Sequence, residues 1–168
     1  ASDVYKRQGN YNDSTAKLYT DMGMFTCKRA YGEDATAVFN MLSGYSEPLS
    51  WNKLALAPTW LRTRFVELIN RERDYAAMGK PARIVAKMNS LCDAGIINAL
   101  YEASAAGVQI ELIVRGICCL KQGVPGMSET IQVRSIVGTF LEHSRIFYFE
   151  NDGSPEIYMG SACLLYTS

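Results

Sequence analysis

The chain of 168 residues is poor in the groups that most metal and nucleic-acid sites need. It has a single histidine, His143, and equal numbers of basic and acidic residues, 17 of each. One histidine excludes a His-rich metal site and any active site that takes two histidines from this chain alone. A net charge of zero gives no sign of nucleic acid or a membrane surface as partner. An anion site therefore has to come from local clustering of cations.

Several other signals are also missing. No apolar run approaches the ~20 residues that span a bilayer, and no charged-then-apolar signal peptide opens the chain. The five cysteines form no CxxC pair, which indicates reduced thiols rather than a disulfide framework or a zinc site. Cys118 and Cys119 end an apolar segment, so we predict that they pack rather than act as nucleophiles. The glycines at 123 and 126 lack the Lys-Ser/Thr of a P-loop and predict a turn.

Hydrophobic periodicity predicts an α/β fold. Apolar spacing favours a helix over 33–42 and a longer helix from Pro58 to near Gly79. A strand over 82–88, a helix capped by Asp93 and ended by Gly107, and a strand over 108–114 follow. Such tight joints predict a βαβ unit with parallel strands and a right-handed crossover. Three further strands are expected over 131–136, 141–150 and 156–160, which gives a mixed sheet covered by helices.

The segment from Phe140 to Glu150 carries the strongest chemical signal. Side chains alternate along a strand, so His143 and Arg145 would project from one face. An imidazole beside a permanent cation suits phosphoryl chemistry, because the ring can protonate a leaving oxygen or attack phosphorus while the guanidinium binds phosphate oxygens. The alternative is a lone strand histidine satisfied by a neighbour.

These residues resemble the sequence motif of a known superfamily. His143-x-Arg145-x4-Glu150, with Gly160-Ser161 downstream, is a relaxed form of the phospholipase D superfamily motif. The stretches SIVGTFLEHSRIFYFEN, IVRGICCL and GNYNDSTAKLYTD resemble bacterial-type polyphosphate kinases in particular, and the likeness runs over residues 9–162. The resemblance implies a phospholipase D-like mixed sheet flanked by helices, here truncated.

The resemblance also implies roles for single residues. Tyr19 would contact ATP, and Arg115 and His143 would line the nucleotide and phosphate site, with Arg145 beside them. Arg115 stands just past the end of a predicted parallel strand, where open α/β sheets bind ligands. Lys87 is a candidate polyanion contact. Core packing of Tyr19, and a solvated surface position for Arg115 or Lys87, remain open as alternatives.

The organisation of the chain follows from the same likeness. Residues 1–8 and 163–168 show no continuity with their neighbours, and we expect them to be a non-native leader and tail, frayed and exposed. Residues 9–50 would end a first catalytic lobe, with a turn-rich linker over 43–48. Residues 51–162 would form most of a second lobe. The family's phosphorylated histidine and its metal-associated residues would lie upstream, so we assign no metal ligand here and expect the isolated chain to be inactive.

The function implied is that of a kinase that passes the γ-phosphoryl of ATP to polyphosphate through a phosphohistidine, with Mg²⁺ on the phosphates. Its partners would be ATP, ADP and inorganic polyphosphate, with no nucleic acid. We expect the full-length protein to be a homo-oligomer in the cytoplasm. Whether it also associates with a membrane stays open. Two alternatives remain: a phospholipase D-like phosphodiesterase, and a non-catalytic module that binds polyanions.

Overall fold

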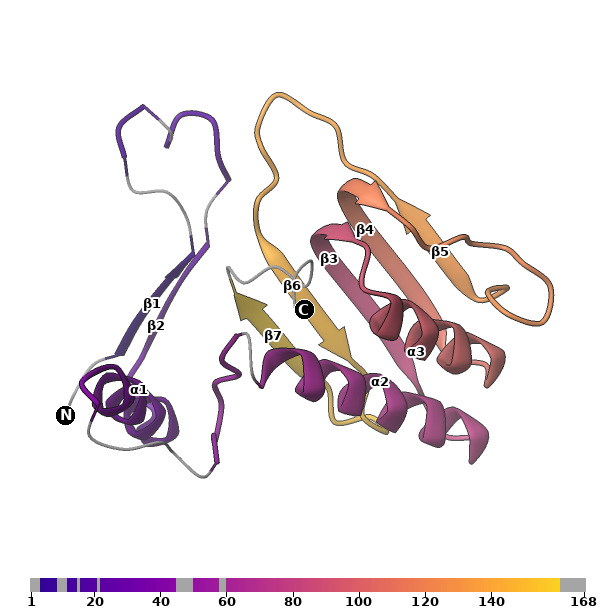
Figure 1. The fold of residues 1–168 in the computed structure, drawn as a ribbon, viewed down its shortest axis with the longest axis horizontal. Helices are drawn as coiled ribbons and strands as arrows, with labels where there is room; N and C mark the ends of the chain where they lie inside the picture. Colours follow the sequence, from indigo (N-terminus) through magenta and orange to yellow (C-terminus); the bar gives the residue numbers. More distant parts are fainter. Residues whose placement is uncertain are drawn as a thin grey trace.

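A computed structural model describes residues 4–8, 12–14, 16–20, 22–44, 50–57 and 60–160. Its larger part is a sheet in the order β5-β4-β3-β6-β7, with two helices against it (Figure 1). The strands are β3 (Arg83–Leu91), β4 (Gln109–Cys118), β5 (Ile131–Arg134), β6 (Arg145–Phe149) and β7 (Glu156–Gly160), and the helices are α2 (Leu61–Ala77) and α3 (Ala94–Ala105). The predicted α/β class and mixed sheet are confirmed.

The βαβ unit forms where the local signals predict it. The Asp93 carboxylate accepts a hydrogen bond of 2.9 Å from the Ile96 backbone N–H and so caps α3. The helix ends at Ala105, and Gly107 follows its C-cap with a φ of 101°, in the region that glycine enters without strain. β3 then pairs in parallel with β4, and β4 pairs in parallel with β5.

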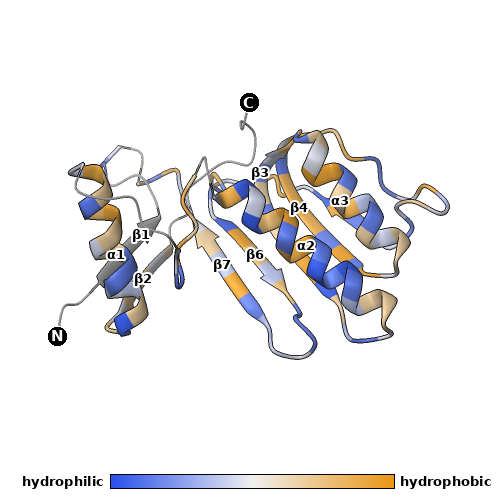
Figure 2. Ribbon diagram, turned by 60° about the horizontal axis from the view of Figure 1, so that its bottom comes forward, coloured by the Kyte–Doolittle hydropathy of each residue, from blue (hydrophilic) through white to orange (hydrophobic). Residues whose placement is uncertain are grey.

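One face of the sheet is buried under both helices (Figure 2). Alternate residues of β4, Ile110 and Leu112, are at most 1% exposed, and Phe65 of α2 packs against Phe147 of β6 with ring centroids 4.4 Å apart. Burial of these apolar side chains is the main force that holds the helices on the sheet. The intervening residues of the strands point to the face opposite the helices.

Several predicted boundaries are wrong in an informative way. The strand expected over 141–150 begins only at Arg145, so His143 lies in the connection that precedes β6. β6 pairs with β3 from Lys87↔Ile146 onward, while Leu141 forms an isolated bridge with Tyr19 instead. The long helix is described from Leu61 and ends at Ala77, near the predicted stop, and Pro58 lies outside the described residues.

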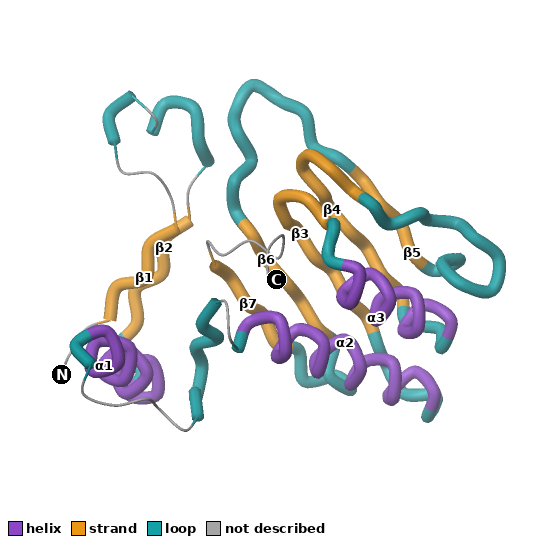
Figure 3. The backbone as a smooth tube through the Cα atoms, viewed as in Figure 1, coloured by secondary structure: helices purple, strands orange, loops and turns teal. Residues whose placement is uncertain are grey.

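A second, smaller group of elements precedes the main sheet (Figure 3). β1 (Val4–Gln8) pairs antiparallel with β2 (Met22–Thr26), and α1 (Arg29–Leu42) follows, four residues earlier than predicted. The expectation that residues 1–8 are frayed is therefore wrong for the backbone of 4–8, because β2 satisfies its hydrogen bonds. Residues 163–168 and most of the predicted linker lie outside the described residues.

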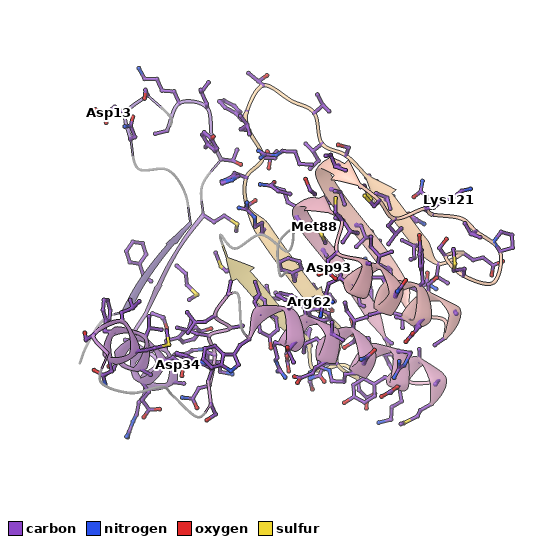
Figure 4. The ribbon with its side chains drawn as sticks, viewed as in Figure 1. Asp13, Asp34, Arg62, Met88, Asp93 and Lys121 are labelled. Atoms are coloured by element: carbon purple, nitrogen blue, oxygen red, sulfur yellow. The ribbon has the colours of Figure 1, made fainter. Side chains whose placement is uncertain are left out.

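A buried carboxylate joins α1 to the segment that leads into the main sheet. Asp34, which is 2% exposed, accepts hydrogen bonds from the backbone N–H groups of Asn52, Lys53 and Leu54 and from the Asn52 side chain, at 2.6 to 3.0 Å (Figure 4 labels Asp34). Burial disfavours the charged form, but these hydrogen bonds outweigh it and lower the pKa of Asp34.

Asp34→Asn is expected to destabilise this junction at pH 7 by roughly 2–3 kcal/mol, because the new amide turns donors toward backbone N–H groups. A carboxyl with a depressed pKa stabilises the fold above its unfolded pKa of about 3.9, and this contribution disappears as the pH falls through the folded pKa. Urea unfolding at pH 7 and near pH 3 measures the difference. It should shrink in acid, and an equal difference at both pH values would contradict the account.

Candidate functional site

The candidate site lies where β3 and β4 end and β6 begins. These strand ends meet because β6 runs antiparallel to β3. Arg145, the first residue of β6, is 7% exposed. Its Nη1 donates to the backbone carbonyl of His143 at 3.2 Å and lies 3.4 Å from His143 Nε2. The two predicted catalytic residues are therefore in contact, although His143 lies ahead of the strand rather than on it.

Tyr19 reaches the same place from far away in the sequence. Thr20 N–H donates to the Leu141 carbonyl at 3.2 Å, and Leu141 N–H donates to the Leu18 carbonyl. This parallel bridge brings the segment 16–20 beside the connection between β5 and β6 (Figure 1). The Tyr19 and His143 rings meet edge to face, with centroids 5.3 Å apart and an angle of 78°. Tyr19 is partly exposed, so it is not a core residue.

Lys87 of β3 lies on the face of the sheet opposite the helices, and its ammonium group is paired with a carboxylate. Its Nζ donates to Glu142 Oε2 at 2.5 Å and to Ser144 Oγ at 2.7 Å. The hydrogen bond and charge of Lys87 lower the pKa of Glu142. Sequence reasoning missed Glu142 as the partner of Lys87.

Arg115 occupies the last regular step of β4, in register with Asn89 of β3. It alternates with the buried Val114, so it points away from the helices, whereas Arg145 shares the helix-covered face of Phe147. Both arginines stand at the same edge of the sheet, and their convergence on one ligand stays a prediction. Arg115 Nη1 and Arg145 Nε are each buried without a hydrogen-bond partner among the residues that the structure describes.

The start of α3 is occupied by a protein carboxylate. Arg62 of α2 holds Asp93 through two contacts, Nε to Oδ2 at 2.9 Å and Nη2 to Oδ1 at 3.2 Å (Figure 4). The Arg62 hydrogen bond is the main cause that lowers the pKa of Asp93. A helix N-terminus commonly binds an anion, and here Asp93 already fills that position.

Glu150, the acidic position of the relaxed motif, lies beyond the far end of β6 from His143 and accepts a hydrogen bond from Tyr148. Within the described ranges, no group of three or more His, Cys, Asp or Glu is placed to hold a metal ion. None of the described helices is long and apolar enough to cross a membrane.

Comparison with known proteins gives one family throughout. Residues 54–167 match the family model "Polyphosphate kinase C-terminal domain 2", and residues 4–48 match "Polyphosphate kinase C-terminal domain 1". The polyphosphate kinases of Synechocystis sp. and Thermosynechococcus vestitus are 59% and 56% identical over 159 residues, which is 95% of this chain and 22% of each relative. The chain thus spans about a fifth of the length of these relatives.

A solved structure agrees with the sequence matches. The crystal structure of the polyphosphate kinase from Porphyromonas gingivalis superposes with a TM-score of 0.88 at 39% identity. The match covers 98% of this chain and 27% of that one.

Proposed function

Because the chain belongs to the polyphosphate kinase family, we propose that its Tyr19, Arg115, His143 and Arg145 bind the phosphates of ATP and of a growing polyphosphate chain. The reaction proposed for the whole enzyme is transfer of the γ-phosphoryl group of ATP to the end of polyphosphate, by way of a phosphohistidine. Such transfer depends mostly on positioning and on neutralising charge, which arginine side chains do well.

Two buried arginine N–H groups give the proposal its main support. Arg115 Nη1 and Arg145 Nε are buried N–H donors without an acceptor among the described residues. Leaving such a donor unsatisfied costs about 1–3 kcal/mol, and a phosphate oxygen would remove that cost with a charge-assisted hydrogen bond. The two donors stand at the same end of the sheet but on opposite faces, so a single ligand that satisfies both has to be an anion long enough to reach around the strand ends, as a polyphosphate is.

His143 is proposed as a phosphate ligand or general acid rather than the phosphoryl carrier. Its ring contacts both Tyr19 and Arg145. The positive charge of the neighbouring guanidinium attracts the negatively charged oxygens of a phosphate to this position. An imidazole there can protonate a leaving oxygen. The carrier would be a second histidine, supplied by another part of the enzyme. Tyr19 would hold the nucleotide.

Lys87 is proposed as a secondary polyanion contact. Its ammonium already binds Glu142 and Ser144, so contact with a phosphate requires an exchange of partners. Mg²⁺, if bound, would neutralise charge on the phosphates, and we assign no described residue to it. The activity, its cytoplasmic location and a homo-oligomeric state of the whole enzyme are all part of the proposal.

Arg115→Ala, made in a full-length polyphosphate kinase that carries this segment, is expected to lower turnover roughly 10²- to 10³-fold, as for one lost donor to a developing charge. Arg134→Ala is the matched control, because Arg134 is an exposed cation on the neighbouring strand β5. The initial rate of polyphosphate synthesis from ATP measures both, and a phosphodiester substrate assayed in parallel tests for phospholipase D-like hydrolysis. Equal rates for the two variants would contradict the role of Arg115.

A further inference from the structure

Two thiols meet just beyond the ends of the parallel strands. Cys92 follows the last residue of β3, and Cys119 follows the last residue of β4. The Cys119 N–H donates to the Leu91 carbonyl at 2.8 Å, which holds the two segments side by side. Cys92 Sγ and Cys119 Sγ are 3.5 Å apart. Neither cysteine is among the residues assigned to the phosphate site proposed above.

The backbone geometry at this point suits a cross-link. Neighbouring strands lie about 4.7–4.9 Å apart, within the roughly 4.4–6.8 Å that separates the Cα atoms of a disulfide. Leu91 and Cys118, the residues immediately before the pair, are in register across β3 and β4. Small rotations of two side chains at strand ends would shorten the sulfur separation to a bond of about 2.05 Å.

The other described cysteines differ in their surroundings. Cys118 packs against the hydrophobic core, and its Sγ lies 3.7 Å from the Leu120 carbonyl oxygen. Cys27 follows β2, in the separate small sheet. The prediction that Cys118 and Cys119 both pack is wrong for Cys119, which is exposed. Because Cys92 is partly buried, an external reagent reaches Cys119 first.

We propose that Cys92 and Cys119 form a reversible disulfide by exchange with a low-molecular-weight disulfide such as oxidised glutathione. The Cys119 thiolate attacks one sulfur of that disulfide, and one glutathione leaves as a thiolate. The Cys92 thiolate then attacks Cys119 Sγ and displaces the second glutathione. The protein dithiol loses two electrons and two protons, and one disulfide molecule is reduced to two thiols.

The cross-link would join the ends of β3 and β4 close in sequence to a helix cap and to a proposed phosphate ligand. Cys92 immediately precedes Asp93, which caps α3, and Cys119 lies four residues after Arg115. A disulfide stabilises mainly by restricting the unfolded chain, so the oxidised form should melt at a higher temperature, by roughly 5–10 °C.

The test is incubation of the 168-residue chain with oxidised glutathione, followed by peptide mapping by mass spectrometry without reduction. The expected product is a peptide that links Cys92 to Cys119, which dithiothreitol reverses. Cys92→Ser should instead keep one glutathione on Cys119, because the resolving thiol is gone. Cys118→Ala and Cys27→Ser are matched controls, and both should still form the linked peptide.

Three results would overturn the proposal: the absence of a linked peptide in the folded chain, a link that uses Cys27, Cys118 or Cys163 in place of this pair, or an oxidised chain that melts at a lower temperature than the reduced one. Circular dichroism of each variant confirms folding before oxidation. Loss of linkage by an unfolded variant is thereby distinguished from loss by a folded one.

Discussion

The purified 168-residue chain, incubated with ATP, is expected to make no polyphosphate. Its single histidine, His143, contacts Tyr19 and Arg145 and is proposed as a phosphate ligand or general acid. A mechanism through a phosphohistidine then needs a second histidine, and a covalent route without its nucleophile is lost rather than slowed. Thin-layer separation of the products of labelled ATP measures polymer directly.

The control is a full-length polyphosphate kinase rebuilt with this segment in place of its own, which should make polymer under the same conditions. It shows that the segment is competent when the rest of the enzyme is present. ATP-dependent polymer made by the isolated chain would contradict the division of roles, because His143 would then have to carry the phosphoryl group itself.

His143→Ala in that full-length enzyme is expected to lower turnover by roughly 10²- to 10⁴-fold, the usual contribution of a positioned general acid. Phosphorylation of the carrier histidine by ATP should survive at least in part, since His143 is not the carrier. Steady-state polymer synthesis gives the turnover, and brief incubation with labelled ATP gives the phosphorylated enzyme.

The matched control for His143→Ala is Tyr148→Phe. Tyr148 lies on β6, the strand that follows His143, and its hydroxyl donates a hydrogen bond to Glu150 at the end of β6 away from His143. This change removes a hydrogen bond without touching the site, so turnover should stay near normal. If His143 only packs, its variant should melt lower yet turn over normally per folded molecule, and that outcome would end the catalytic role.

The fold was largely predictable because its strongest signals are local. The Asp93 cap, the Gly107 stop and the apolar repeats of β3 and β4 each act within a few residues, and the structure confirms them. The start of β6 was not predictable in this way. Whether residues 141–144 join the strand depends on pairing with Tyr19, more than a hundred residues earlier, and no local pattern encodes such a contact.

The candidate site was likewise predictable only where local signals or the resemblance pointed to it. His143 does contact Arg145 as expected, but the strand period of two behind that expectation is wrong, because His143 precedes β6. The resemblance alone pointed to Tyr19. Three acidic residues were missed as partners or anchors: Glu142 with Lys87, Asp93 with Arg62, and Asp34 with the segment 52–54. Ion pairs and buried hydrogen bonds between distant elements depend on the folded arrangement, so composition and spacing do not predict them.

The central claim is that His143 stands in a phosphate site, and the single histidine makes this directly measurable. Its ring is the only imidazole in the chain, so its nuclear magnetic resonance signals need no assignment by mutation. Addition of tripolyphosphate to the folded chain is expected to shift these signals saturably, and Arg145→Ala should weaken the response. Ring signals that stay unchanged in a folded chain up to millimolar tripolyphosphate would contradict the claim.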